Sequence, residues 1–144
     1  KALTDDFSTR TGIHTEFETV VFRNRLDQEA RIALYRVAQE ALNNIERHAR
    51  AEHVFMSLKG HRNGAMLHIK DDGIGMVWPR PSRRRSSGLR VLIMQERSEQ
   101  LGGSLRILSA RTGKTGTVIE AQVPLTHMLR PQQTSKAQDK KESA

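Results

Sequence analysis

One long helical pattern, bracketed by strand patterns, limits the folds open to this chain of 144 residues. Between Asp27 and Arg50, apolar residues recur at steps of three and four, as on one face of an α-helix. A strand pattern precedes it at 13–21, and two more follow at 53–59 and 65–70, joined by the turn sequence GHRNG. The helical apolar positions are Ile32, Leu34, Val37, Ala38, Ala41, Leu42, Ile45 and Ala49.

The second half of the chain has one helical pattern followed by two strand patterns, after a loop rich in Pro, Arg and Ser at 77–87. A helical pattern starts at Gly88 and is stopped by Gly102 and Gly103, and strand patterns follow in SLRILSA and GTVIEAQVPL. Neighbouring strand patterns predict hairpins. We therefore expect an α+β fold, a two-layer α/β sandwich with a mixed, largely antiparallel sheet and helices on one face.

Composition narrows the class of protein further. The absence of Cys excludes disulfides and thiolate metal sites, and favours a reducing compartment. No apolar run approaches the ~20 residues that span a bilayer. The sequence begins without Met, so we expect a fragment of a longer protein. Such a protein is compatible with membrane-spanning segments upstream of this sequence.

The net charge of +8 is concentrated in RPSRRRSSGLR, at 80–90. Such a run is compatible with a basic nucleic-acid-binding domain, or with a solvated surface loop. Aromatic residues make up only 4% of the chain, and none interleaves these arginines, which argues against a platform that stacks bases. The loop at 77–87 ends at Ser86, Ser87 and Gly88 before a helix, a natural place for phosphate.

Two further motifs carry polar groups. Glu40, Asn44 and His48 share one stripe of the first helix, with Arg47 beside them, which alone could be a solvated flank. The sequence DDGIGM follows a strand pattern, and its two glycines allow the backbone to approach a ligand closely. An ordinary Asp-Gly turn is the simpler alternative. Neither a dinucleotide fingerprint nor a P-loop is present. GKTGT, by itself, reads as a hairpin turn.

In combination, these motifs resemble the ATPase domains of histidine kinases, and more narrowly the nitrate/nitrite-sensor-like subfamily. LYRVAQEALNNIERHA resembles the N-box, DDGIGM the first glycine box, and GLRVLIMQERSEQLGG the second box with its helix. The match spans roughly residues 5 to 126. The resemblance implies the Bergerat ATP-binding fold, with ATP and Mg²⁺ as ligands.

The resemblance also implies roles for single residues. Asp71 would hold the adenine amino group, Gly73 and Gly75 would let the chain wrap the base, and Thr117 would be a second contact near adenine. Residues 77–87 would form a lid over ATP.

At the phosphate end, the resemblance gives Asn44 the role of Mg²⁺ ligand and places Glu40 near the γ-phosphate as a polar or basic catalytic group. Arg47 and His48 would lie toward the phosphates, and Gly88 would be the hinge of the lid. Gly88 precedes Met94 by six residues, whereas the subfamily usually has four.

A sensor kinase of this type phosphorylates a His that is followed by an acid. None of the histidines in this chain is followed by an acid; they are His14, His48, His53, His61, His68 and His127. The resemblance therefore implies the ATP-binding catalytic domain of a two-component sensor histidine kinase, without its phosphoacceptor.

The expected organisation is the end of a preceding dimerisation helix or linker at 1–12, the catalytic domain at 13–128 and a disordered polar tail at 129–144. Expected partners are the phosphoacceptor dimerisation domain and, indirectly, a response regulator, with no nucleic acid. The parent protein is expected to be a cytoplasmic or membrane-anchored homodimer. The alternative is a nucleotide-binding regulatory module without kinase activity.

Overall fold

The computed structural model describes residues 1–20, 25–62, 64–75, 86–109, 116–124, 126 and 128–129. Its helical elements are α1 (Ala2–Thr11), α2 (Gln28–Asn44), the short π-helical turn η1 (Ile45–Ala49) and α3 (Ser86–Gln100). Its strands are β1 (His14–Val20), β2 (Arg25–Leu26), β3 (His53–His61), β4 (Gly64–Asp71), β5 (Ser104–Ser109), β6 (Thr117–Pro124) and β7 (Met128–Leu129).

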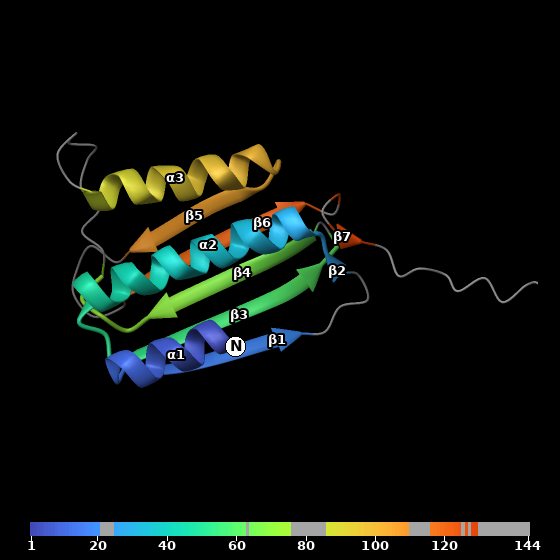
Figure 1. Ribbon diagram of the computed structural model, residues 1–144. Helices are drawn as coiled ribbons and strands as arrows, with labels where there is room; N and C mark the ends of the chain where they lie inside the picture. The colour runs from blue at the N-terminus through green and yellow to red at the C-terminus, as the bar shows by residue number, and fades with distance from the viewer. Residues whose placement is uncertain are drawn as a thin grey trace, which may run out of the picture.

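Five strands form one sheet in the order β1-β3-β4-β6-β5, and α1, α2 and α3 lie on the same face of it (Figure 1). β4 pairs antiparallel with β3 and β6, and β5 pairs antiparallel with β6. The predicted two-layer sandwich with a largely antiparallel sheet is confirmed. β1 and β3 are parallel, because α2 carries the chain back to the end of the sheet where β1 began.

The helical pattern of the first half becomes α2, whose start is fixed by a cap. Asp27 Oδ1 accepts a hydrogen bond from the backbone N–H of Ala30 at 2.8 Å, which satisfies one of the unpaired donors of the first turn. The apolar face packs on the sheet. Its buried members are Ala30, Ala33, Leu34, Val37, Ala38, Ala41 and Leu42.

The end of this helix differs from the prediction of a regular helix to Arg50. The last turn is a π-helix, and Arg50 ends it with a φ of 50°. The apolar spacing from Ile45 to Ala49 is compatible with either helix type, and both residues are buried. The carbonyl of Ala49, the last residue of this turn, accepts the N–H of Ile74 at 2.8 Å.

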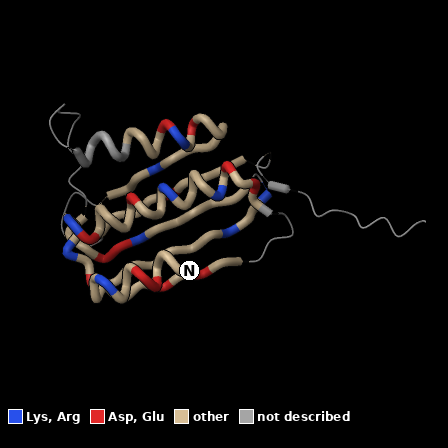
Figure 2. The backbone as a smooth tube through the Cα atoms, viewed as in Figure 1, with Lys and Arg blue, Asp and Glu red and all other residues tan. Residues whose placement is uncertain are grey.

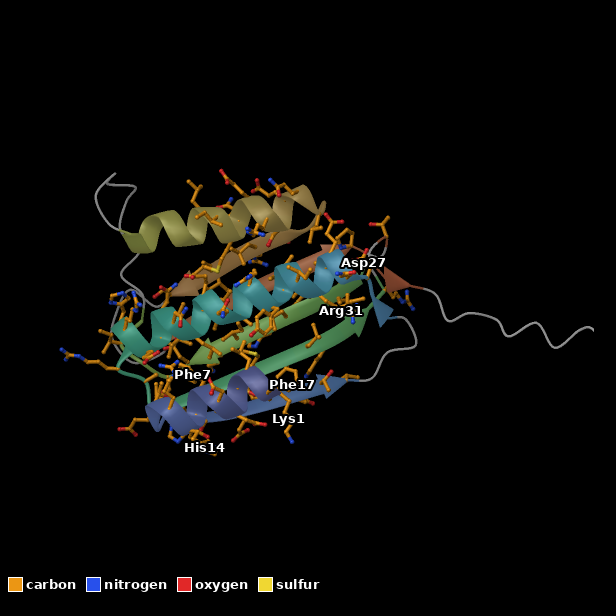
Figure 3. All side chains as sticks on the ribbon, in the orientation of Figure 1. Lys1, Phe7, His14, Phe17, Asp27 and Arg31 are labelled. Carbon is orange, nitrogen blue, oxygen red and sulfur yellow. The ribbon has the colours of Figure 1, made fainter. Side chains whose placement is uncertain are left out.

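α1 packs its own side chains into the core of the sandwich. Phe7, labelled in Figure 3, and Thr4 are each only 2% exposed. Gly12 ends the helix in a left-handed conformation, with φ of 74°. The helix thus shares a hydrophobic core with α2 and the sheet.

Two further differences from the prediction concern the start of α3 and the short strands β2 and β7. α3 begins at Ser86, so Ser86 and Ser87 are helical instead of closing the loop, and Gly88 lies in the first turn. No Pro stands at 86–88, and Gly weakens a helix without ending it. β2 and β7 pair antiparallel in a second small sheet that the sequence did not predict. The predicted lid up to residue 85, and the tail from residue 130 on, lie outside the described residues.

Candidate functional site

The predicted site residues are carried to one end of the sandwich. The C-terminal ends of α2 and β4 and the start of β6 all lie on the left in Figure 1, where α3 also begins. Because β4 and β6 are antiparallel neighbours, with Lys70 opposite Val118, Asp71 comes to lie beside Thr117. The fold therefore brings together the motifs around Asn44, Asp71 and Thr117.

Asp71 is the central charged group of this end. Its side chain is 2% exposed, with Oδ1 accepting the N–H of Gly73 at 2.9 Å and Oδ2 accepting the N–H of Thr117 at 3.2 Å. Burial raises the pKa of the Asp71 carboxyl, and the bonds from Gly73 and Thr117 oppose that rise. A carboxylate held in this way has lone pairs left to accept a bond from an amino group of a ligand.

Each glycine near Asp71 meets its own structural requirement, either a close approach to another backbone or a positive φ. A Cβ on Gly73 would stand 2.1 Å from the carbonyl oxygen of Ala49, so Gly73 allows the turn after β4 to lie directly on η1. Gly75 has a φ of 81°, which side chains disfavour. Gly116, which was not among the predicted site residues, would place a Cβ 1.8 Å from the carbonyl oxygen of Asp71. Its signal in the sequence was the T-G-T that ends GKTGT.

Asn44 faces the core from the last turn of α2 and is 5% exposed. Its Nδ2 is buried and has no hydrogen-bond partner among the described residues. Buried polar groups usually have hydrogen-bond partners, so an amide without one at this position is available to contact a ligand. Rotation of the amide presents its oxygen at the same place, and oxygen is the donor that Mg²⁺ prefers, so the residue fits the predicted ligand.

The other predicted phosphate-end residues lie around Asn44. Glu40, one turn earlier on α2, is half-buried, as is Asn43. Arg47 and His48 are exposed on η1. Their neighbour Glu46 pairs with Arg10 of α1 at 2.6 Å, which ties the start of the chain to this turn.

Asp72, which the sequence reasoning passed over, makes more contacts than its exposed position suggests. Its Oδ1 accepts the N–H groups of Glu52 and His53, each at 2.9 Å, and its Oδ2 contacts Nδ1 of His53 at 2.7 Å. The bond from the His53 N–H is the largest cause that lowers the pKa of the Asp72 carboxyl. The doubled Asp in DDGIGM was the only signal in the sequence.

The described residues carry charges of both signs, without a cluster of metal-binding side chains among them. Acidic and basic positions are interspersed along the coloured helices and strands of Figure 2. No three His, Cys, Asp or Glu side chains within the described ranges are placed to hold a metal. Among the described helices, none has the length and apolar character to cross a membrane.

Comparison with known proteins identifies relatives of this arrangement. The family described as histidine kinase-, DNA gyrase B- and HSP90-like ATPases matches residues 29–127. The sensor histidine kinase MctS of Rhizobium johnstonii is 40% identical over 119 residues, which are 83% of this chain and 26% of MctS. The oxygen sensor histidine kinase NreB of Staphylococcus carnosus is 32% identical over 120 residues, which are 83% of this chain and 33% of NreB.

Solved structures share the fold at low sequence identity. The histidine kinase domain of the blue-light activated kinase of Erythrobacter litoralis has a TM-score of 0.65 at 18% identity, covering 85% of this chain and 58% of that one. The ATP binding domain of PrrB from Mycobacterium tuberculosis has a TM-score of 0.58 at 19% identity, covering 85% of this chain and 91% of that one. The chain thus spans about a quarter to a third of the length of the two sensor kinases, and most of the PrrB domain.

Proposed function

Because this chain belongs to the family of histidine kinase-, DNA gyrase B- and HSP90-like ATPases, as the ATP-binding catalytic domain of a sensor histidine kinase, we propose that it presents the γ-phosphate of ATP to a histidine on a separate dimerisation domain. The observation that carries the proposal is the buried Asp71 carboxylate, held by two backbone donors beside a glycine turn.

Recognition of the base is the task we assign to Asp71. A carboxylate oxygen accepts the amino group of adenine, whereas guanine presents a carbonyl at that position and is repelled. Gly73 and Gly75 keep the backbone close to the base, and Thr117 supplies a second polar contact beside Asp71. Since Asp71 and Thr117 are already bonded to each other, little rearrangement is needed when the base binds.

The phosphates are assigned to the end of α2. When bound, Mg²⁺ neutralises and aligns the phosphate oxygens, which is most of what phosphoryl transfer requires from its catalyst. Asn44 would hold that cation through its amide oxygen, and Glu40 would supply a polar or basic group near the γ-phosphate. Arg47 and His48, exposed on η1, would add positive charge and hydrogen bonds. Gly88, in the first turn of α3, would be the hinge of the lid.

The partner that receives the phosphate is proposed to lie outside this sequence. In this subfamily the acceptor is a histidine that is followed by an acidic residue. None of the six histidines in this sequence is followed by one. We assign the acceptor to a dimerisation domain of the parent protein, which would be a homodimer that passes the phosphate to a response regulator. The domain would act in the cytoplasm, whether or not the parent is anchored in a membrane.

A nucleotide titration with and without Mg²⁺ tests the first half of this proposal, and labelling with γ-labelled ATP tests the second. The chain alone is expected to bind ATP, more tightly with Mg²⁺, yet to gain almost no acid-labile phosphate. A cognate dimerisation domain added in trans should restore only weak labelling, because the covalent tether that raises effective concentration is missing. Failure to bind ATP would overturn the proposal, and strong labelling of the chain alone would contradict the missing acceptor.

A further inference from the structure

The turn after β4 is hydrogen-bonded to the segment between η1 and β3. These hydrogen bonds take no part in the contacts proposed for ATP. Asp72 receives the N–H groups of Glu52 and His53 on Oδ1, while its own N–H bonds the carbonyl of His53 at 3.2 Å. Ile74 adds the bond to Ala49 already described. The turn is therefore held on both sides of Gly73.

These bonds matter because of where Asp72 stands. The N–H that holds Oδ1 of Asp71 belongs to Gly73, and its peptide group joins Asp72 to Gly73. Any rotation of the backbone at Asp72 moves this donor, and with it the orientation of the buried carboxylate. The Asp72 carboxylate accepts the N–H groups of Glu52 and His53, whereas that of Asp71 accepts those of Gly73 and Thr117, so Asp72 is anchored through partners of its own.

From this geometry we infer that Asp72 is a positioning residue for adenine-nucleotide binding, which acts by fixing the peptide group that orients Asp71. The inference rests on the proposed function of Asp71. The backbone contacts carry most of the effect, since the side-chain pair with His53 is exposed, at 63% for His53 and 45% for Asp72, and exposed pairs contribute little. Asp72 needs no contact with the nucleotide itself.

The test is calorimetric titration of the chain with ADP, with and without Mg²⁺. Asp72→Ala is expected to weaken ADP binding about tenfold, the size seen when an outer contact that orients a ligand-binding group is lost. The loss should be the same with and without Mg²⁺, because it arises at the base. Asp72→Asn should bind within about twofold of wild type, since Asn and Asp accept backbone N–H groups almost equally well.

A second comparison separates positioning from a general effect on folding. If Asp72 acts through Asp71, adding Asp72→Ala to Asp71→Asn should weaken binding little further, because residues that act as one unit are not additive. Asp27→Ala is the matched control, since it also removes a carboxylate that accepts a backbone N–H, but at the opposite end of α2 (Figure 3). It should lower the melting temperature and leave the ADP affinity unchanged.

The outcomes distinguish the two proposals. No binding of ADP by the wild type overturns the proposed function, and this role of Asp72 with it. Binding by the wild type that Asp72→Ala leaves unchanged, or losses that add fully to those of Asp71→Asn, overturn the positioning role alone. If Asp72→Ala does not fold by circular dichroism, Asp72→Glu replaces it. Glu keeps the charge but displaces the carboxylate, so full affinity in Asp72→Glu would also overturn the inference.

Discussion

Asp71→Asn is the substitution that most directly probes the proposed adenine contact. It keeps the size and one acceptor oxygen of the side chain, but replaces the second oxygen by a donor. If the amide oxygen stays on the N–H of Gly73, the new NH₂ group faces the N–H of Thr117. If the amide turns over, its NH₂ faces Gly73 instead, so in either orientation a donor meets a donor.

The size of the effect follows from these contacts. Hydrogen bonds to charged groups contribute about 1.5–3 kcal/mol, and a buried donor left without a partner costs about 1–3 kcal/mol. We therefore expect ATP binding to weaken at least about tenfold, or ~1.4 kcal/mol. The free energy of unfolding should change less, because the amide also removes a charge whose burial is unfavourable, as the raised pKa of Asp71 indicates.

Calorimetric titration with ATP measures the loss, and circular dichroism confirms that the variant is folded. Asp72→Asn is a sharp control, because it makes the same chemical change one residue later in the chain and should leave the affinity within about twofold. An Asp71→Asn protein that is folded and binds ATP as tightly as the wild type would refute the adenine contact.

Three further outcomes are expected. Asn44→Ala should reduce the gain in ATP affinity that Mg²⁺ gives more than it reduces metal-free binding; an equal gain in both proteins would show that Asn44 does not hold the metal. Gly73→Ala should lower the free energy of unfolding by about 1–3 kcal/mol in urea, because its Cβ would stand 2.1 Å from the carbonyl oxygen of Ala49, and an unchanged midpoint would contradict that contact. Burial raises the pKa of Asp71 in the folded state, so the folded protein binds its proton more readily than the unfolded chain. The contribution of Asp71 to stability should therefore increase as the pH falls through the raised pKa toward 3.8, and comparison of unfolding curves for wild type and Asp71→Asn should show a difference of that sign.

The elements with strong local patterns could be predicted from the sequence. The apolar spacing between Leu34 and Leu42 allows no strand, and the turn signal before Gly64 marks the hairpin of β3 and β4. The parallel pairing of β1 with β3 could not be predicted in the same way. Its partners, such as Phe17 and Met56, are distant in sequence, and their alternating patterns would fit either strand direction.

The residues proposed for the site could be named from the sequence, but not the contacts that hold them in the structure. Asp71 and Asn44 were identified through the resemblance of their motifs, and the structure finds both buried at one end of the sheet. Gly73 was expected to be glycine so that the chain could wrap the base, whereas the structure shows a close approach to Ala49. Asp72 was passed over because its partners, two backbone N–H groups on β3 and the segment before it, leave no trace in side-chain patterns.

The bond between Asp71 and Thr117 joins residues 46 positions apart, across β4 and β6, which α3 and β5 separate in the sequence. Only a chain with β4 and β6 in register can offer both groups to a ligand. Nucleotide would then bind the folded chain but not the unfolded chain. By mass action it would shift the folding equilibrium toward the folded state. At a concentration a hundredfold above Kd, this linkage would contribute about 2.7 kcal/mol to stability. The cellular ATP level would thereby set how often this domain opens to proteases, in addition to supplying its substrate.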